Sequence, residues 1–409
     1  MSDLNCRSCQ SQRVRRILSL GTTPLANSLL REEQLTHVEP RFPLTVVFCE
    51  SCSLVQIEHT VPPEELFSDY VYLSSFSTTM VRHAAAIADR MAVERALTAE
   101  SRVIEIASND GYLLQHYRSR DIPVLGIEPA RNIAAIAEKE RGIPTLTEFF
   151  GRDCAGRLAA DGLKADVIHA NNVLAHVPDI NGFVAGLALV LKPTGTAVIE
   201  VPYLKDLIDH VEFDTIYHEH VFYFSLTALE RLFRQNGLEI FDVERVAIHG
   251  GSLRLFVGHP GSNPVRERVA ALLAEEALWG VNDFGFYADF SDRVTQFRTA
   301  LNALIDDLRG RGQKIAVYGA SAKGSTLLNF CGLDRSRLAY AADRSTVKQG
   351  LYTPGSHLLI RPPESLIEDM PDCLLLLAWN FADEILEQQS DYRSRGGRFI
   401  IPLPELKIV

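Results

Sequence analysis

The sequence has no long hydrophobic run and no excess of basic residues. Its most apolar stretch, residues 374–379, is far shorter than the roughly 20 residues that cross a bilayer. The first residues have neither a basic head nor an apolar core, so we expect no secretory signal. A formal net charge of −11 argues against sequence-independent nucleic-acid binding, which needs a basic surface. We therefore expect a cytoplasmic protein with no nucleic-acid or membrane partner.

Cysteine is scarce, with seven residues in a chain of 409, yet two close pairs lie near the start. Without a secretory signal, these pairs indicate metal ligands or free thiols and not disulfides. A Cys-x-x-Cys turn directs two thiolates at one metal, and four thiolates around zinc form a closed, structural site. Four unrelated cysteines are the alternative. We predict a zinc that holds a small N-terminal segment together, with the ligands Cys6, Cys9, Cys49 and Cys52.

The length exceeds what one hydrophobic core supports and indicates two or three domains. Residues 1–75 contain the cysteine pairs and are rich in turns. Residues 76–262 alternate between strands and helices and end in an antiparallel strand pair, and residues 263–409 begin with a helical, charged stretch before alternating again. Such alternation predicts right-handed βαβ units and parallel sheets. The predicted fold is α/β, with a small zinc-binding domain followed by two doubly wound, Rossmann-like domains.

A strand at residues 102–107 runs into a polar loop that ends at Gly111, and ligands of open α/β sheets bind at the carboxyl ends of strands. Glu128 ends the next strand, where a carboxylate can accept hydrogen bonds from two ribose hydroxyls. The loop lacks G-x-G-x-x-G, which weighs against NAD, although a site for another nucleotide is an alternative to S-adenosylmethionine. The candidate cofactor-binding residues are Glu105, Ala107, Asn109, Gly111, Glu128, Asn171 and Asn172.

Tyr217, His218, Glu219 and His220 follow the fourth strand and are surrounded by aromatic residues. Histidine is the natural general base near neutral pH, and a tyrosine can donate to a developing oxyanion. His176 follows the third strand and opens on the same side. A second metal site is one alternative, but His218 and His220 alternate faces in an extended chain, and a surface loop with stray histidines is another.

Residues 314–325 form a strand, a glycine loop and a helix start, which is a pattern that favours a phosphate. The candidates here are Ser321, Lys323 and Gly324, together with Asp343 at the end of the next strand. The alternative is a Rossmann-like domain that has a packing role and binds no nucleotide. An NAD-dependent nucleotide-sugar oxidoreductase would use this loop, but Gly-x-x-x-x-Gly is not the dinucleotide spacing. A non-enzymatic, zinc-bearing nucleotide-binding module is disfavoured by the cluster at residues 217–220.

The motifs described above, taken in their order along the chain and together with residues 70–75 and 249–254, resemble the zinc-containing deoxysugar C-methyltransferases. The resemblance covers essentially the whole chain. The resemblance implies a class I methyltransferase domain at 76–262, a nucleotide-sugar-binding domain at 263–409, and S-adenosylmethionine as methyl donor. It implies a dTDP-linked 4-keto-6-deoxysugar methylated at C3, in antibiotic or surface-glycan pathways, and a monomer or weak homo-oligomer. It implies His220 as base, Tyr217, Glu219 and His218 near the sugar, His176 beside the reacting carbon, and Tyr70 or Tyr72 in the same pocket.

Overall fold

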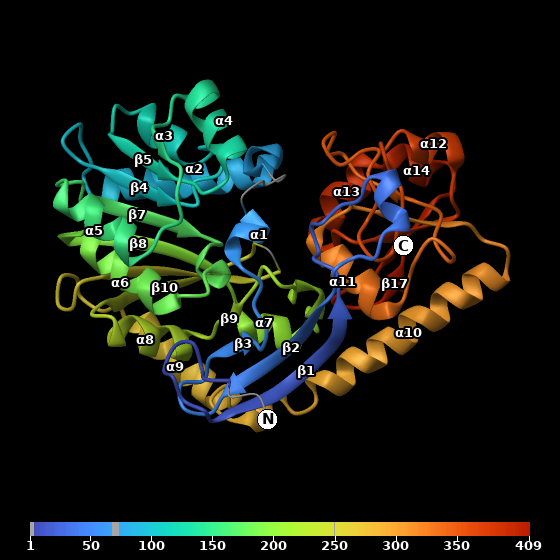
Figure 1. The fold of residues 1–409 in the computed structure, drawn as a ribbon, viewed down its shortest axis with the longest axis horizontal. Coiled ribbons are helices and arrows are strands. Elements are labelled where there is room, and N and C mark those ends of the chain that lie inside the picture. Colours follow the sequence, from blue (N-terminus) through green and yellow to red (C-terminus); the bar gives the residue numbers. More distant parts are fainter. Residues whose placement is uncertain (1–3, 68–72, 249) are drawn as a thin grey trace.

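The computed structural model describes residues 4–67, 73–248 and 250–409. Two α/β lobes lie beside each other above a small N-terminal sheet, and the long helix α10 (Phe290–Gly310) runs beneath the C-terminal lobe (Figure 1). The predicted Tyr70 and Tyr72 lie outside the described residues. No helix in the described part of the chain is both long and apolar enough to cross a membrane.

The first lobe is built on a seven-stranded sheet of order β10-β11-β8-β7-β4-β5-β6. The strands from β6 to β8 are parallel, whereas β11 is antiparallel to β8 and to β10, which confirms the predicted closing pair. The order reverses at β4, between β5 and β7, and such a switch point is where open α/β sheets bind ligands. The strands are β4 (Val103–Ile106), β5 (Val124–Ile127), β6 (Thr145–Leu146), β7 (Ala165–Asn171), β8 (Leu191–Pro202), β10 (Glu239–Val246) and β11 (Ser252–Gly258).

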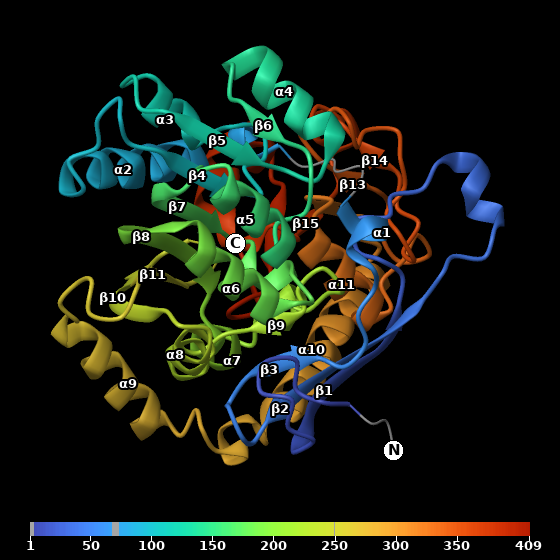
Figure 2. The same ribbon diagram turned by 60° about the vertical axis from the view of Figure 1, so that its left-hand side comes forward.

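Helices cover both faces of this sheet (Figure 2). α2 shows why they form: Met80, Ala84, Ile87 and Met91 repeat at helical spacing and are buried, and the Ser77 hydroxyl caps the first turn by accepting from the Met80 N–H. The helices are α2 (Thr78–Glu94), α3 (Leu114–Arg118), α4 (Arg131–Arg141), α5 (Arg152–Ala160), α6 (Ile180–Val190), α7 (Leu204–Asp209), α8 (Leu226–Gln235) and α9 (Glu267–Trp279), with 3₁₀ turns η2 (Ser74–Phe76), η3 (Leu174–His176) and η4 (Phe213–Thr215).

Helix α9 lies beyond the predicted boundary at residue 262 but is attached to the first lobe. Its Glu276 is fully buried and accepts hydrogen bonds from the backbone N–H groups of Leu226 and Thr227 at the start of α8, and from the Tyr203 hydroxyl. A buried carboxylate needs such donors. Helix α9 therefore completes the packing of the first lobe.

The second lobe contains a six-stranded sheet of order β14-β13-β12-β15-β16-β17, parallel except for β17, as predicted for a Rossmann-like domain. Its strands are β12 (Ile315–Tyr318), β13 (Ala341–Ala342), β14 (Ile360–Arg361), β15 (Cys373–Leu376), β16 (Arg398–Ile401) and β17 (Lys407–Ile408). Its helices besides α10 are α11 (Ala322–Cys331), α12 (Ser365–Asp369), α13 (Ala382–Gln388) and α14 (Ser390–Ser394), with η6 (Trp379–Phe381). The turn η5 (Phe284–Tyr287) precedes α10 and packs on Phe48 of the N-terminal segment.

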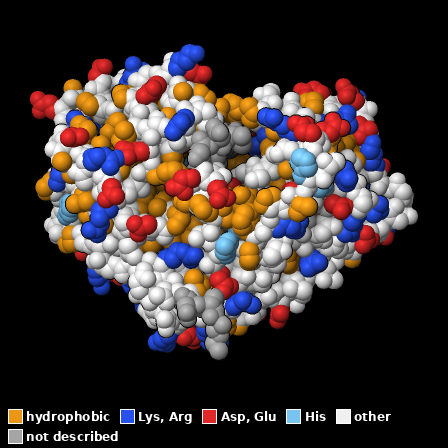
Figure 3. Space-filling model, in the orientation of Figure 1, with side chains coloured by type: hydrophobic (Ala, Val, Ile, Leu, Met, Phe, Trp, Pro, Cys, Tyr) orange, Lys and Arg blue, Asp and Glu red, His pale blue; other side chains and the backbone are white. Residues whose placement is uncertain are grey.

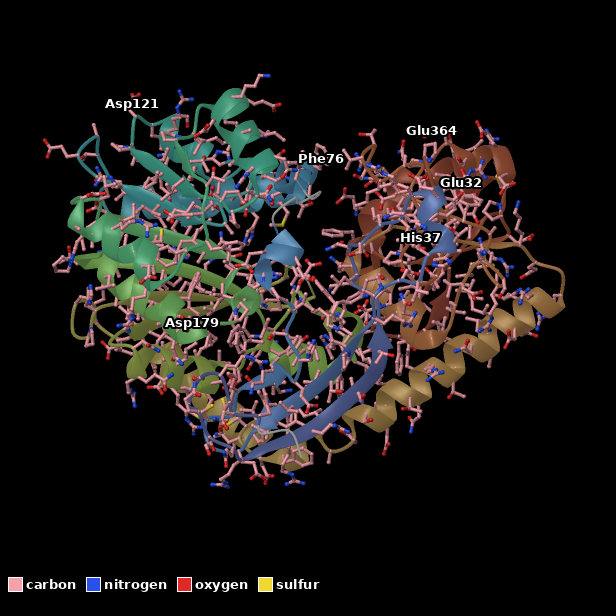
Figure 4. The ribbon with its side chains drawn as sticks, viewed as in Figure 1. Glu32, His37, Phe76, Asp121, Asp179 and Glu364 are labelled. Carbon is pink, nitrogen blue, oxygen red and sulfur yellow. The ribbon has the colours of Figure 1, made fainter. Side chains whose placement is uncertain are left out.

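The N-terminal segment contributes β1 (Val14–Thr23), β2 (Phe42–Cys49), β3 (Val55–Ile57), η1 (Glu32–Thr36) and α1 (Pro63–Phe67). The fourth strand of its antiparallel sheet is β9 (Phe222–Tyr223), which comes from the first lobe. Between β1 and β2 the chain crosses to the second lobe, where Leu30 pairs with Tyr352 and the Glu39 carboxylate accepts from His357 Nε2 at 2.5 Å. Glu32 and His37 lie beside that lobe in Figure 4. The N-terminal segment thus contacts both lobes.

Candidate active site

The four predicted zinc ligands meet at one point. Their sulfur atoms all lie within 4.8 Å of one another, with Cys6 and Cys52 at 3.5 Å and Cys9 and Cys49 at 3.6 Å. Sulfurs bound tetrahedrally to zinc at about 2.3 Å stand roughly 3.8 Å apart, so the donor set fits a closed zinc site. Within the cluster, hydrogen bonds between the thiols raise the pKa of Cys6 to about 12 and lower that of Cys49 to about 2. A divalent cation would displace the shared protons.

The zinc cluster is tied to the first lobe. The Asn181 amide, in the first turn of α6, donates to the carbonyl oxygens of Arg7 and Ser8 at 3.0 and 2.9 Å. Gln235, at the end of α8, donates to the Ser8 hydroxyl at 3.0 Å. These bonds hold the first Cys-x-x-Cys turn on two helices, so a metal there would stabilise an interface as well as a turn.

A cavity of about 630 Å³ opens between the lobes, and side chains from all three parts of the chain line it. Figure 3 shows the hollow, with hydrophobic side chains on the surface below it. Of the predicted site residues, the structure places these in the lining: Ala107, Asn109, Glu128, Asn171, Asn172, His176, Tyr217, His220, Ser321 and Lys323. Outside the lining are Glu105, Gly111, His218, Glu219, Gly324 and Asp343.

The loop after β4 is shaped by left-handed residues. Ala107 and Asn109 have φ of 51° and 50°, so non-glycine residues provide the tight turn. The buried Glu128 carboxylate holds this loop, since it accepts from the backbone N–H of Asn109 at 3.0 Å and of Ala130 at 2.9 Å. Burial raises the pKa of Glu128. Each carboxylate oxygen keeps a second lone pair, which is what a ribose hydroxyl requires.

Two asparagines at the end of β7 leave acceptors ready for a ligand. The Asn171 and Asn172 side-chain oxygens are buried and have no hydrogen-bond partner within the described residues. Buried polar atoms are nearly always paired, so these two indicate a ligand with donor groups, such as the amino or hydroxyl groups of a nucleoside cofactor. Both residues lie at the carboxyl end of β7, the neighbour of the switch-point strand β4.

Glu105 and Gly111 belong to the support of the cofactor loop. Glu105 is buried beneath it, and burial raises the pKa of its carboxyl group well above the usual range. Gly111 has φ of 77°, and a Cβ there would lie 2.8 Å from the Ile143 side chain. Its place in the structure is explained by close packing, not by contact with the cavity.

Residues 217–220 form a turn that divides the cluster into two pairs. The His220 N–H donates to the Tyr217 carbonyl at 2.9 Å, so the first and last residues point the same way and line the cavity. His218 and Glu219 are outside the lining and contact the N-terminal segment, His218 at strand β2 and Glu219 at the β1–β2 connection. His218 Nε2 lies 3.2 Å from the Pro43 carbonyl oxygen, and the Glu219 carboxylate accepts from Asn27 at 2.6 Å.

The hydrogen bonds of His220 determine its tautomer. Its Nδ1 lies 2.8 Å from the Thr215 carbonyl oxygen, which can only accept, so Nδ1 carries the proton. In the neutral ring, Nε2 therefore has the lone pair, and it accepts from the Tyr217 hydroxyl at 2.8 Å. An imidazole held in this way, at the wall of a cavity, is arranged to take up a proton at Nε2.

His176 stands edge-on to His220, with ring centroids 4.8 Å apart. Burial lowers the pKa of His176 to about 4, so this ring is neutral near pH 7. A neutral neighbour can form hydrogen bonds but is a weak base. Burial also raises the pKa of Glu219 to about 7, against the opposing effects of Asn27 and Lys348.

The glycine loop of the second lobe faces the same cavity. The Ser321 hydroxyl accepts from the Gly324 N–H at 3.1 Å and caps α11, and the Lys323 ammonium lies 4.7 Å from the centre of the Trp379 ring. Asp343 stabilises the loop, since its carboxylate accepts from the Ala320 N–H at 2.6 Å. Gly324 allows close packing, because a Cβ there would lie 2.7 Å from the Leu377 side chain.

The sequence analysis missed Asn27, Lys348 and Asn380, which also line the cavity. The Lys348 ammonium donates to the Ala320 carbonyl at 2.8 Å and adds a second cation beside the glycine loop. Asn27 meets Glu219 across 192 residues of sequence. No local motif marks these positions, since only the tertiary fold brings them to the site. Among the described residues, the four cysteines are the only group of three or more possible metal ligands that lie close together.

Comparisons with known proteins find matching families in the N-terminal, central and C-terminal parts of the chain. Residues 6–67 match a family of zinc binding domains, residues 80–243 a methyltransferase domain, and residues 247–404 the C-methyltransferase C-terminal domain. C-methyltransferase NovU of Streptomyces niveus is 37% identical over 406 residues, which cover 99% of this chain and 96% of that protein.

Two further similarities are partial. Ubiquinone biosynthesis O-methyltransferase of Rhodopseudomonas palustris is 32% identical over 102 residues, which cover 24% of this chain and 38% of that protein. Among solved structures, magnesium protoporphyrin IX methyltransferase of Synechocystis PCC 6803, with bound SAH, is similar with a TM-score of 0.36 and 13% identity, over 43% of this chain and 82% of that one.

Replacing one zinc ligand should release the metal. We expect Cys49→Ser to lose about one zinc per chain and to lower the melting temperature, because the remaining thiolates no longer close the tetrahedron. Metal analysis by mass spectrometry and a thermal melt measure both effects. Cys154→Ser, at a buried cysteine outside the cluster, is the control and should keep its metal. Metal-free wild-type protein that melts at an unchanged temperature would contradict the zinc site.

Glu128→Gln should weaken cofactor binding on the order of tenfold, because hydrogen bonds to a charged acceptor are stronger than those to a neutral one. Titration calorimetry with adenosylhomocysteine measures the affinity, and Glu138→Gln, on the exposed face of α4, is the control. Because burial raises the pKa of Glu128, wild-type affinity should fall on acidification before an ordinary carboxyl group would titrate. Equal affinity of the two variants would rule out this role.

Proposed function

This chain belongs to the C-methyltransferase family and is an S-adenosylmethionine-dependent C-methyltransferase with a zinc-binding domain, and we propose that it methylates C3 of a dTDP-linked 4-keto-6-deoxysugar. One observation carries the proposal: the His220–Tyr217 pair lines a cavity shared by the cofactor loop of the first lobe and the glycine loop of the second. A nucleotide sugar that spans these loops would bring its sugar to the pair.

The chemistry requires a carbon nucleophile. The proton next to a ketone is weakly acidic, and its removal leaves an enolate whose carbon can attack an electrophile. We assign the removal to Nε2 of His220, because the Thr215 carbonyl keeps the proton of the neutral ring on Nδ1. S-adenosylmethionine, when bound, would supply a methyl group on a sulfonium. The enolate carbon would form the new carbon–carbon bond as the carbon–sulfur bond breaks, which would leave a neutral thioether and restore the ketone.

Tyr217 has the position of an oxyanion donor. In the free protein its hydroxyl donates to His220 Nε2. When the keto group enters, the hydroxyl would turn to the carbonyl oxygen and leave the Nε2 lone pair for the substrate proton. Donation to the developing enolate oxygen would stabilise the charge where it forms. The neutral His176 ring, edge-on to His220, adds no positive charge that would make His220 a weaker base.

The second lobe would bind the nucleotide diphosphate. The N-terminus of α11 presents backbone N–H groups, and Lys323 and Lys348 bring two ammonium groups to the same wall of the cavity. Glu128 and the asparagines after β7 would hold the cofactor on the opposite side. Free thiols throughout the described chain fit a reducing compartment, so we place the reaction in the cytoplasm.

His220→Asn should lower kcat by about 10²–10⁴-fold, which is the usual contribution of a general base. The same variant should no longer exchange the substrate α-proton with deuterated solvent when adenosylhomocysteine replaces the donor. Tyr217→Phe should slow the exchange without abolishing it. Mass spectrometry of dTDP-4-keto-6-deoxyglucose follows both reactions, and His37→Asn, at an exposed histidine, is the control. Exchange at the wild-type rate in His220→Asn would transfer the role of base to another group.

Lys323→Ala should raise KM for the nucleotide sugar about tenfold or more and leave adenosylhomocysteine affinity unchanged, since it removes a charge-assisted contact to one ligand only. Steady-state kinetics and calorimetry separate the two effects. Lys139→Ala, at an exposed lysine of α4, is the control. The reverse pattern, with weaker adenosylhomocysteine binding and unchanged KM, would place the cofactor in the second lobe and contradict the proposed diphosphate site.

A further inference from the structure

A buried hydrogen bond joins the two lobes beside the cavity. Asp214, in η4 of the first lobe, is fully buried, and its Oδ2 accepts from the indole N–H of Trp379 in the second lobe at 2.6 Å. Trp379 begins η6, and its neighbours Ala378 and Asn380 line the cavity. A carboxylate that bonds across a domain interface at such depth fixes the orientation of the indole ring.

The same indole supports Lys323. The ammonium group lies 4.7 Å from the ring centre, within the range of a cation–π contact. Lys323 also acts on Asp214: burial raises the pKa of Asp214, and the ammonium opposes that rise. Lysine, indole and carboxylate therefore form one electrostatic unit, called here the Lys323–Trp379–Asp214 unit.

On its other side, this unit reaches the general base. Asp214 precedes Thr215, whose carbonyl oxygen accepts from His220 Nδ1–H at 2.8 Å. The turn is seated on α11, since Phe213 packs against Phe330 with ring centroids 5.2 Å apart and the Ile216 carbonyl accepts from the Thr326 hydroxyl at 3.2 Å. One peptide unit thus separates the carboxylate that holds Trp379 from the carbonyl that holds His220.

We infer that Asp214 and Trp379 are positioning residues that set the distance and orientation between the diphosphate-binding lysine and the general base. The inference rests on the proposed function, in which Lys323 binds the diphosphate and His220 removes the proton. The Asp214 carboxylate orients the indole, and the indole orients the ammonium. Through the backbone, the same residue anchors the carbonyl that fixes the tautomer of His220. Neither residue touches the reacting atoms, and both act through their neighbours.

Three single variants and one double variant test this role with dTDP-4-keto-6-deoxyglucose as substrate. Trp379→Phe keeps an aromatic face for Lys323 but loses the N–H, and Asp214→Ala loses the acceptor. Each should raise KM on the order of tenfold and slow α-proton exchange, while adenosylhomocysteine affinity stays unchanged. Asp214→Asn retains a carbonyl acceptor and should stay within about threefold of wild type. The double variant Asp214→Ala/Trp379→Phe should be no worse than the worse single variant, because both remove the same bond.

The chain offers a matched control in its other tryptophan. Trp279 on α9 also has a lysine over its ring, with Lys205 Nζ 4.0 Å from the centre, but it does not line the cavity. Trp279→Phe should leave KM unchanged. A purely structural role for Asp214 and Trp379 would lower the melting temperature and the active fraction of their variants without moving KM, and that result would overturn the inference.

The experiments distinguish a failure of the positioning role from a failure of the proposed function. If Lys323→Ala raises KM whereas Trp379→Phe and Asp214→Ala do not, the positioning role is wrong and the proposed function stands. If Lys323→Ala leaves KM unchanged, the proposed diphosphate site itself is wrong. Should Trp379→Phe not fold, as judged by lost adenosylhomocysteine binding, the contrast between Asp214→Asn and Asp214→Ala decides. Equal KM values for that pair would overturn the inference.

Discussion

The site depends on one constraint: the segment from Phe213 to Tyr223 is held by all three parts of the chain at once. Its end is the β9 strand of the N-terminal sheet, and its start packs on α11 of the second lobe. Between these anchors, the turn at 217–220 points one pair of side chains into the cavity and the other towards the N-terminal segment. A catalytic histidine in a short turn would be poorly positioned by local interactions alone. Here its backbone is fixed from three directions.

Burial gives the ionisable groups around this turn different properties. Burial lowers the pKa of His176, which makes it a weaker base. Burial raises the pKa of Glu219 to about 7, and the Glu219 carboxylate accepts a hydrogen bond from Asn27. His220 differs from both, because its ring accepts at Nε2 and donates at Nδ1. Three histidines of the same chemistry thus lie in three different environments in this region: His176, His218 and His220. Position, and not residue type, distinguishes the proposed base from its neighbours.

Much of the first lobe could be predicted from the sequence, because hydrophobic periodicity reports buried faces directly. The strand predicted at residues 102–107 is present as β4, one residue shorter at each end, and the closing antiparallel pair is present. Cys-x-x-Cys spacing was enough to predict the metal cluster. Strands β1 and β2 were missed in a segment that was interpreted as rich in turns. Register shifts in β1, between Arg16 and Leu18 and between Ser19 and Thr22, interrupt the alternation by which strands are recognised.

The candidate site was predictable only where local pattern implied position. Residues that follow a strand, such as Asn109 and Asn171, could be placed at the sheet edge and do line the cavity. The division of Tyr217 and His220 from His218 and Glu219 could not be foreseen, because it depends on a turn and on partners far away in the sequence. Asn27 and Asp214 carry no motif at all. Their contacts form only when the tertiary structure brings the parts of the chain together.

This arrangement also explains how a metal far from the chemistry can matter to it. The four cysteines fix the ends of β2 and the first turn of the chain, and the hydrogen bonds of Asn181 and Gln235 fix that turn on α6 and α8. The β1–β2 connection then supplies Asn27 to the Glu219 carboxylate, and β2 supplies the Pro43 carbonyl to His218. Without the metal, His218 and Glu219 would lose the support of the N-terminal segment on their side of the turn at 217–220. A structural zinc in this fold is therefore connected to the position of His220 through the geometry of a single turn.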